Sequence, residues 1–233
     1  MRRSYDALVT GLHDSTHSDG DEEYAMALVV NLPKQDKPHR NDVLVAAGQA
    51  VVATVLDPQA ADNPEFARWY GKRIRKITRR ARNIAWERVQ DVPGVTVTHG
   101  TASVRAFVPA PVHATDPRVD KLQIGGTDLP FDEYQGSSQG ICGVFIDTSL
   151  KMSLGKATAQ VGHATMLFAA SRPCSEVEAW ATAGFPLTVR EVSHEEFIAE
   201  ASRADAVVVH DAGFTEVAPG SATVVAVPRG ADT

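Results

Sequence analysis

The stretch that decides the fold reads KMSLGKATAQVGHA and spans residues 151–164. The apolar run 141–146 precedes it and predicts a buried strand. Ser153 is a good N-cap residue, so we expect a helix to begin directly after it. Lys156 and Gln160 lie four residues apart and would share one face of that helix.

This strand, loop and helix place a cluster of hydrogen-bond donors at one point. Lys151 lies in the loop and Lys156 in the first turn of the helix, where the backbone dipole also favours negative charge. Such a terminus suits a phosphate group or a developing oxyanion. His163 shares this face two turns further on, and we interpret it as a buried, hydrogen-bonded histidine rather than a catalytic base.

Composition limits the class of protein. The 233 residues suffice for one large or two small domains, and 43% of them are hydrophobic, an ordinary share for a globular protein. No apolar run approaches the roughly 20 residues that span a bilayer.

Residues 1–23 lack the apolar segment of a signal peptide and predict a disordered leader, so we expect a cytoplasmic protein without a membrane partner. Cys142 and Cys174 show no metal-binding spacing; we expect no metal and no cofactor, with Cys142 a buried thiol.

Positive charge is concentrated in one segment. Residues 68–88 contain nine Lys or Arg and one acid, so this segment carries +8 and the rest of the chain −14. Pro64 suits the first turn of a helix, which we predict from residue 65 to about 90. A basic element in an acidic protein indicates an anionic partner. Trp69 and Trp86 either form the apolar stripe of this helix or stack on bases.

The order of elements repeats along the chain. A shift of 114 residues places Gly48 on Gly162, and both halves end in two strands. We therefore predict an α/β fold, a mixed β-sheet with helices on both faces, in two related halves that form an internal pseudo-dimer. The expected segments are a leader (1–23), a degenerate half with the basic helix (24–112), a linker (113–139) and a catalytic half (140–233). The expected strands are 24–32, 95–98, 103–108, 141–146, 187–192, 205–210 and 223–227, and the expected helices are 43–56, 65–90, 153–170, 174–183 and 195–204.

A second motif, DAGFTEVAPGS at residues 211–221, follows a predicted strand. Together with residues 151–164 it resembles the type II peptidyl-tRNA hydrolase family, and the resemblance extends from residue 141 to about 228. The resemblance implies a mixed sheet with helices on both faces and hydrolysis of the ester that joins a peptide to the 3′ end of tRNA. It also implies a reaction without metal, and frequent homodimers.

The resemblance assigns Lys156, Asp211 and Thr215 as catalytic residues, with Lys151 and Gln160 in support. These residue types suit the chemistry, because ester hydrolysis needs an activated water, a stabilised oxyanion and a grip on a polyanionic leaving group. Asp211 can orient a water directly or through the Thr215 hydroxyl. Taken alone, an Asp-Ala-Gly sequence is also a common turn.

Two residues depart from the family motif. Phe214 stands where the family usually has arginine, and Glu216 where it has glutamine, which makes this loop less attractive to tRNA. The basic segment can restore the attraction through phosphate contacts, for which we select Arg73, Lys76 and Arg80.

The first half lacks the site residues. The 114-residue shift aligns Lys156 with Asp42 and Gln160 with Ala46. We expect chemistry in the second half only, with the first half replacing a partner subunit, so that the protein is a monomer with pseudo-dimeric halves; a homodimer is the alternative. The leading functional prediction is a peptidyl-tRNA hydrolase-like enzyme. The alternatives are a catalytically inactive tRNA-binding or RNA-binding protein and a hydrolase of another ester or amide.

Overall fold

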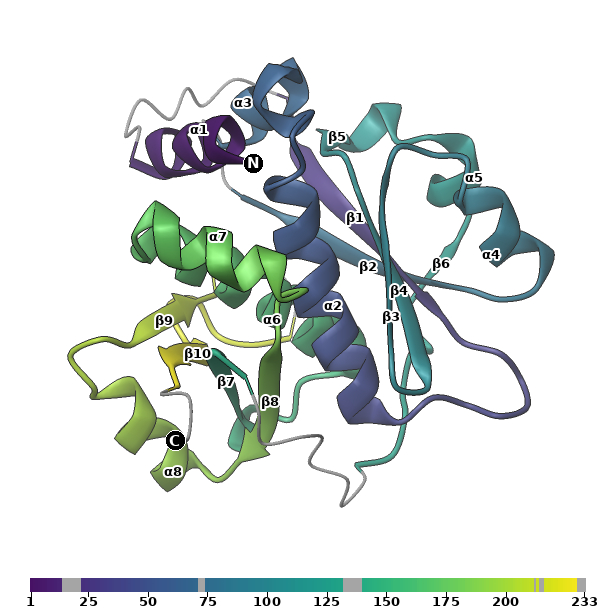
Figure 1. Cartoon of the computed structure of the whole chain (residues 1–233). Coiled ribbons are helices and arrows are strands. Elements are labelled where there is room, and N and C mark those ends of the chain that lie inside the picture. Colours follow the sequence, from purple (N-terminus) through teal and green to yellow (C-terminus); the bar gives the residue numbers. More distant parts are fainter. Residues whose placement is uncertain (14–21, 71–73, 132–139, 212, 214–215, 230–233) are drawn as a thin grey trace.

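A computed structural model describes residues 1–13, 22–70, 74–131, 140–211, 213 and 216–229. It contains two β-sheets, one from each half of the chain (Figure 1). The elements of the first half are α1 (Arg2–His13), β1 (Tyr24–Asn31), α2 (Arg40–Val55), η1 (Ala60–Asp62), α3 (Pro64–Tyr70), β2 (Lys76–Ala81), α4 (Ile84–Val89), β3 (Gly94–His99), β4 (Ala102–Phe107), β5 (Ala110–Pro111), η2 (Val112–Ala114), α5 (Pro117–Asp120) and β6 (Gln123–Ile124). Those of the second half are β7 (Cys142–Asp147), η3 (Thr148–Leu150), α6 (Leu154–Ser171), α7 (Cys174–Thr182), β8 (Leu187–Val192), α8 (His194–Ala201), β9 (Val207–His210) and β10 (Ala222–Pro228).

The two sheets have the same strand order and the same strand senses. In the first half the order is β2-β1-β4-β3, and in the second it is β8-β7-β10-β9. In each, the first pair is parallel and the other two pairs are antiparallel. Two helices, α2 and α3 or α6 and α7, connect the parallel strands, as a parallel crossover requires. The first sheet has two further short strands, β5 beside β1 and β6 beside β2.

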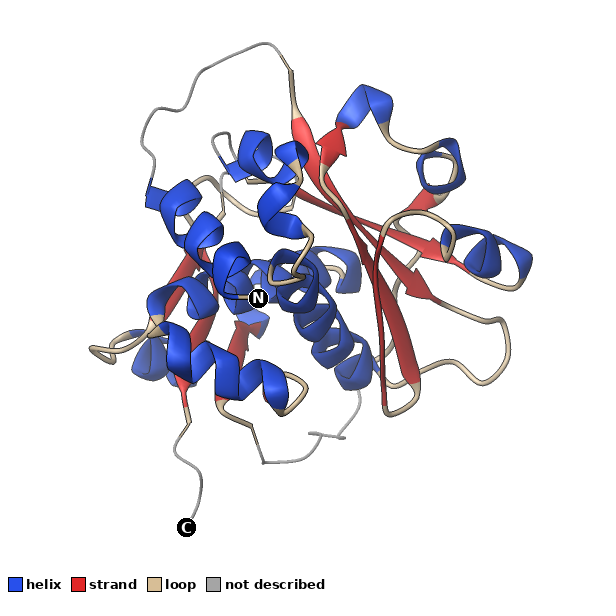
Figure 2. Cartoon of the chain, turned by 45° about the horizontal axis from the view of Figure 1, so that its top comes forward, coloured by secondary structure: helices blue, strands red, loops and turns tan. Residues whose placement is uncertain are grey.

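Helices cover both faces of each sheet, as the sequence predicts. The long helices α2 and α6 pack between the two sheets (Figure 2). Because strand side chains alternate, Leu28 and Val30 of β1 face these helices, whereas Val29 faces α4 and α5 on the outside. In the second sheet Phe145 faces outward against α8. Cys142 is a buried thiol, as predicted, and burial raises its pKa.

The contact between α2 and α6 is reciprocal. A Cβ atom on Gly48 would lie 3.0 Å from Thr165 Cγ2, and one on Gly162 would lie 2.6 Å from Val51 Cγ2. The shift of 114 residues converts the first pair into the second. Thr165 also donates a hydrogen bond from Oγ1 to the Gly48 carbonyl at 3.0 Å. Equivalent residues that contact each other in exchanged roles are typical of a two-fold interface.

The prediction of a disordered leader is wrong for residues 2–13. These residues form α1, in which Leu8 is fully buried. Tyr5 donates a hydrogen bond from its hydroxyl to the Arg172 carbonyl at 2.6 Å, which ties α1 to the end of α6. Residues 14–21 lie outside the described part.

The long basic helix predicted over residues 65–90 is also wrong. The segment contains α3, the strand β2 and α4. Strand β2 pairs parallel with β1, so its basic side chains alternate between two faces instead of covering one exposed helix surface. Arg79 is accordingly buried, and it pairs with Asp120 at 3.0 Å.

The predicted linker, residues 113–139, is structured as far as residue 131. It includes α5 and β6, and Thr127 and Leu129 are buried. The Leu129 carbonyl accepts a hydrogen bond from Arg40 Nη1 at 3.3 Å. This connector therefore packs against both halves instead of only joining them. Residues 132–139 lie outside the described part.

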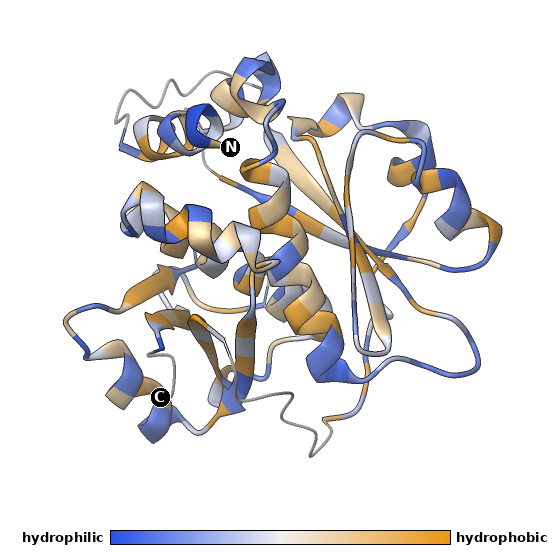
Figure 3. Cartoon of the chain, viewed as in Figure 1, coloured by the Kyte–Doolittle hydropathy of each residue, from blue (hydrophilic) through white to orange (hydrophobic). Residues whose placement is uncertain are grey.

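The distribution of apolar residues follows the layers of sheets and helices. Apolar residues concentrate on α2, on α6 and on the strands that face them (Figure 3). Nearly every residue of α2 is buried, because sheets lie on two of its sides and α6 on a third. Within the described part of the chain, no helix combines the length and the apolar character needed to cross a membrane.

Candidate active site

The site is built at the start of α6. Strand β7 ends at Asp147, and η3 leads to Lys151, which has a left-handed backbone conformation with φ of 50°. Ser153 then caps α6 as predicted, because its Oγ accepts a hydrogen bond from the Lys156 backbone N–H at 3.2 Å. The cap fixes the first helical turn, which carries Lys156.

Lys156 and Asp211 meet in the folded chain, although 55 residues separate them. The Lys156 Nζ lies 2.5 Å from Asp211 Oδ2. Gln160 donates to the same oxygen from Nε2 at 2.6 Å. The side chains of Lys156 and Asp211 are 13% and 7% exposed, so their mutual attraction is only weakly screened by solvent. The structure thus brings together three of the five site residues that the second-half motifs predict.

Further hydrogen bonds orient these groups. Thr223 on β10 is fully buried and donates from Oγ1 to Gln160 Oε1 at 2.9 Å, which fixes the amide with its N–H groups toward Asp211. The other carboxylate oxygen of Asp211 accepts a hydrogen bond from the Gly213 backbone N–H at 2.8 Å. Sequence reasoning missed Thr223; the only signal for it is a threonine within an otherwise apolar strand.

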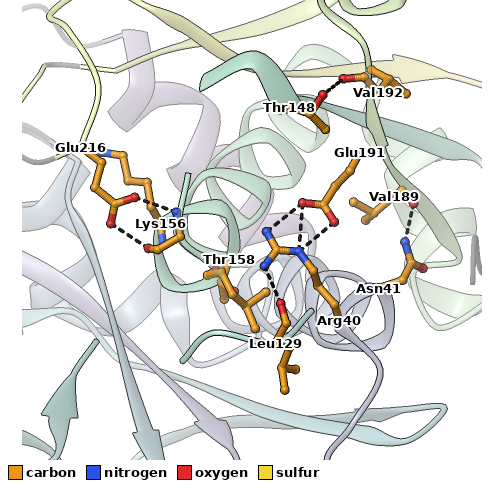
Figure 4. A network of polar contacts seen from close by, with 12 residues as sticks. Arg40, Asn41, Leu129, Thr148, Lys156, Thr158, Val189, Glu191, Val192 and Glu216 are labelled. Carbon is orange, nitrogen blue, oxygen red and sulfur yellow. Dashed lines mark hydrogen bonds and ion pairs between the residues drawn. The ribbon is translucent and has the colours of Figure 1, made fainter. Parts of the chain in front are cut away.

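Glu216 contacts the same helix terminus. Its carboxylate accepts hydrogen bonds from the Ser153 backbone N–H and from Ser153 Oγ, both at 2.7 Å. Figure 4 shows Glu216 beside Lys156 at this end of α6. An anion at a helix N-terminus is favourable, so this departure from the family motif has a structural role that the sequence did not reveal. Thr215 and Phe214 lie outside the described residues.

Lys151 is exposed at the edge of the site. It borders a hollow of about 550 Å³ together with Thr148 and Met152 from the same loop and Phe131 from the connector. Lys151 is thus close in sequence to Lys156, but its side chain is exposed to solvent.

The predicted phosphate contacts of the first half lie in different places. Arg73 falls outside the described residues. Lys76 points inward from β2: its Nζ is 4.9 Å from the centre of the Trp69 ring and 3.9 Å from Met166 Sδ. Burial lowers the pKa of Lys76 to about 7. These contacts do not favour the predicted phosphate contact of Lys76, which no observation tests.

Arg80 lies on the same face of β2 as Lys76, four residues further along. A Cβ atom on Gly126 would lie 3.2 Å from Arg80 Nε, and one on Gly155 would lie 3.1 Å from Thr127 Oγ1. Since residues 126 and 127 are adjacent, Arg80 lies near the first turn of α6. The first half therefore contributes a partly exposed cation, Arg80, to the surroundings of the site, from a strand and not from a helix.

His163 does not take part in the site. Burial, with the positive charge of Lys76 as a second cause, lowers its pKa well below the usual value, so it is neutral near pH 7. The interpretation of His163 as a buried, hydrogen-bonded histidine rather than a catalytic base stays a prediction. Among the described residues, no three His, Cys, Asp or Glu side chains are grouped so as to hold a metal ion.

The arrangement offers a carboxylate, an ammonium group and an oriented amide within hydrogen-bond reach of one another. A carboxylate can accept a proton from water, and an ammonium group can stabilise an oxyanion. These are the groups that hydrolysis of an ester requires.

Comparison with known proteins gives a family match for the second half. Residues 142–232 match the family described as peptidyl-tRNA hydrolase PTH2. The matched segment contains Lys156, Gln160 and Asp211, whereas residues 1–141 lie outside it. No curated protein matches the chain.

Proposed function

We propose that the second half hydrolyses the ester between a peptide, or an N-blocked amino acid, and tRNA, and releases free tRNA. The observation that carries this proposal is the contact of Lys156 and Gln160 with Asp211 at the start of α6, inside the segment that matches the hydrolase family. The description of that family as peptidyl-tRNA hydrolase supports the choice of substrate.

The reaction assigns one role to each group. Asp211 accepts a proton from the attacking water while the water oxygen bonds to the ester carbonyl carbon. Lys156 stabilises the negative charge that develops on the carbonyl oxygen. The ester C–O bond then breaks, and the proton passes to the ribose oxygen. The products are a tRNA hydroxyl and a peptide carboxylic acid, which releases the second proton of the water to solvent and becomes a carboxylate. Thr215 is the proposed hydroxyl that helps to hold the water.

The proposed tRNA surface has contributions from both halves. Lys151 lies in the loop before α6, and Arg80 lies near the first turn of α6. Arg80 donates to the Gly125 carbonyl and to Gln123 Oε1, two acceptors that carry no charge. Its positive charge can therefore attract a phosphate, and Arg73 remains a proposed contact on the same segment.

The first half is proposed to be an inactive second copy of the fold. Its strand order repeats that of the second half, and α2 meets α6 through reciprocal glycine contacts. We infer that this contact replaces the subunit interface of a homodimer, so that one chain is the functional unit.

The test is release of the amino acid from N-blocked aminoacyl-tRNA by the purified full chain. Lys156→Ala and Asp211→Asn should each lower kcat by about 10²–10³, the usual effect of removing one group that stabilises the transition state. Asp42→Asn is the matched control, because Asp42 occupies the position of Lys156 in the first half, and it should leave kcat unchanged.

Circular dichroism and urea unfolding should show that all three variants fold. If wild-type protein releases the amino acid and both site variants match it, the assignment of the site is wrong.

The second candidate function is tRNA binding without catalysis. The observation in its favour is that both Asp211 oxygens already accept hydrogen bonds, from Lys156, Gln160 and Gly213, so a water must compete for them. Absence of release at high protein concentration, together with tight and salt-sensitive tRNA binding, would favour this function.

A further inference from the structure

The hollow beside the catalytic helix has walls from two parts of the chain. Thr148, Lys151 and Met152 come from the loop before α6, and Phe131 comes from the connector, outside the segment that matches the hydrolase family. The hollow measures about 550 Å³, within the range of small-molecule sites. Phe131 is 63% exposed, which is unusual for a phenyl side chain in a folded protein.

The Phe131 ring packs on the guanidinium group of Arg40. The guanidinium carbon of Arg40 lies 4.3 Å from the centre of the Phe131 ring. Arg40 is itself 4% exposed and forms a two-pronged ion pair with Glu191 on β8, at 2.8–3.0 Å (Figure 4). A buried arginine fixed by a bidentate carboxylate is rigid, so it provides a firm support for the ring.

The lining combines an exposed aromatic ring with one cation. Lys151 supplies the charge, and its left-handed backbone conformation at the end of η3 sets the direction of its side chain. Aromatic rings on which bases stack, next to cations that contact phosphates, are the usual elements of single-stranded nucleic-acid binding.

We propose that this hollow binds the unpaired 3′-terminal nucleotides of tRNA, with a base stacked on Phe131 and a phosphate at Lys151. This proposal rests on the proposed function, since the hollow would bind part of the substrate that is hydrolysed at the same site. It makes the connector a determinant of substrate binding that the hydrolase segment alone lacks. The location fits, because Lys151 and Met152 directly precede Ser153, the cap of the helix that carries Lys156.

A base fits the hollow better than the acyl group does. An acyl side chain varies between substrates and needs no cation, whereas the terminal nucleotides are constant and carry a phosphate at each step. The charge of Lys151 in the lining is therefore explained by a nucleotide and not by an amino-acid side chain.

The test measures binding of a fluorescent single-stranded trinucleotide, cytidine-cytidine-adenosine with a free 3′ hydroxyl, to the full chain. Phe131→Ala should raise Kd by about 5- to 150-fold, the range for loss of one stacked base, and Phe131→Tyr should restore binding. Ile84→Ala is the matched control, because Ile84 is 61% exposed on α4 and should have no effect. Lys151→Ala should reduce the slope of log K against log salt by about 0.7, whereas Phe131→Ala should leave that slope unchanged.

The outcomes separate this inference from the proposed function. If the protein releases amino acid from N-blocked aminoacyl-tRNA but Phe131→Ala leaves the trinucleotide Kd unchanged, the inference is overturned and the proposed function stands. If Phe131→Ala changes only the relative rates with different acyl groups, the hollow holds the acyl group, and the inference is again overturned. Tight trinucleotide binding that depends on Phe131, without any release of amino acid, supports the inference and contradicts the hydrolase.

Discussion

The first turns of α2 and α6 make equivalent contacts with different chemistry. In the first half Asp42 Oδ2 accepts hydrogen bonds from the Thr101 backbone N–H and from Thr101 Oγ1, both at 2.7 Å, in the turn between β3 and β4. In the second half Lys156 contacts Asp211, in the segment between β9 and β10. In both halves, side-chain hydrogen bonds thus connect the start of the long helix to the segment between the last two strands. The chemistry differs, because only the second half has an ammonium group and a long loop at this position.

A tryptophan anchors each half in the same way. Trp69 of α3 donates from its indole N–H to the Arg75 carbonyl at 3.2 Å, and Trp180 of α7 donates to the Pro186 carbonyl at 2.9 Å. Each acceptor lies six residues after its tryptophan. The halves differ in what covers the ring: the Phe185 ring lies 5.2 Å from that of Trp180, whereas Trp69 faces the Lys76 ammonium group.

Replacing Lys76 by methionine would place an apolar side chain against Trp69, as Phe185 lies against Trp180 in the second half. Of all the substitutions, this one should have the largest effect on stability. Because the pKa of Lys76 is about 7 in the folded chain and 10.5 in the unfolded chain, the unfolded chain binds more protons between these values. Stability contributed by this group should therefore rise with pH from about 7 to 10.5. At pH 6 Lys76→Met should stabilise the protein by an amount on the order of 3 kcal/mol, allowing for partial exposure of the side chain.

Urea unfolding at pH 6 and pH 10 measures this difference. The difference in free energy of unfolding between variant and wild type should shrink at the higher pH, because the lysine is then neutral in the folded chain and has begun to lose its proton in the unfolded chain. The neighbouring His163 does not interfere, since its lowered pKa keeps it neutral throughout this range. If variant and wild type differed in free energy of unfolding by the same amount at both pH values, the Lys76 ammonium group would be solvated in the folded chain.

The glycines of the helix contact test the two-fold relation between the halves. Gly162→Ala would place a methyl group 2.6 Å from Val51 Cγ2, and Gly48→Ala would place one at 3.0 Å from Thr165 Cγ2. Overpacking costs about 1–3 kcal/mol, and the better helix propensity of alanine returns up to about 1 kcal/mol. We expect Gly162→Ala to lower the free energy of unfolding by about 1–2 kcal/mol and Gly48→Ala to change it by less than about 0.5 kcal/mol.

Chemical unfolding of both variants gives these values, and the double variant Gly162→Ala/Val51→Ala should recover part of the loss through a favourable coupling energy. Light scattering on the same samples should give the mass of one chain. Equal stabilisation by the two single substitutions would show that the helices are not closely packed, and a mass of two chains would contradict the internal pseudo-dimer.

Much of the second half is predictable from local signals. Ser153 marks the start of α6, the apolar runs mark β7 and β10, and two separated motifs indicate that Lys156 and Asp211 belong to one site. The orienting contacts are not predictable in this way. Thr223 reaches Gln160, and Glu216 reaches Ser153, across 63 residues in each case, so no local pattern reveals them.

The first half is harder to predict because its charged residues are placed by distant partners. The run of arginines suggests one exposed helix, but Arg79 is buried on a strand, where Asp120 and the carbonyls of Asp120 and Leu122 accept hydrogen bonds from its two Nη groups. Helix α1 is stabilised by a hydrogen bond to residue 172, far along the chain. Burial of a charge against a remote partner is invisible to hydrophobic periodicity.

Arg80 provides the smallest predicted effect and tests whether the first half assists the second. Since it removes the proposed phosphate contact, Arg80→Ala should raise the KM for the tRNA ester by a few-fold and reduce the slope of log K against log salt by about 1, with kcat unchanged. Arg88→Ala is the matched control: it removes the same charge from α4, on the outer face of the sheet, and should change neither quantity. If both substitutions shift the salt slope equally, the attraction is a diffuse effect of the basic segment and Arg80 has no special position. An effect confined to Arg80 would show that the half without the proposed catalytic residues still supplies a substrate contact, through the inner face of the strand that packs against α6.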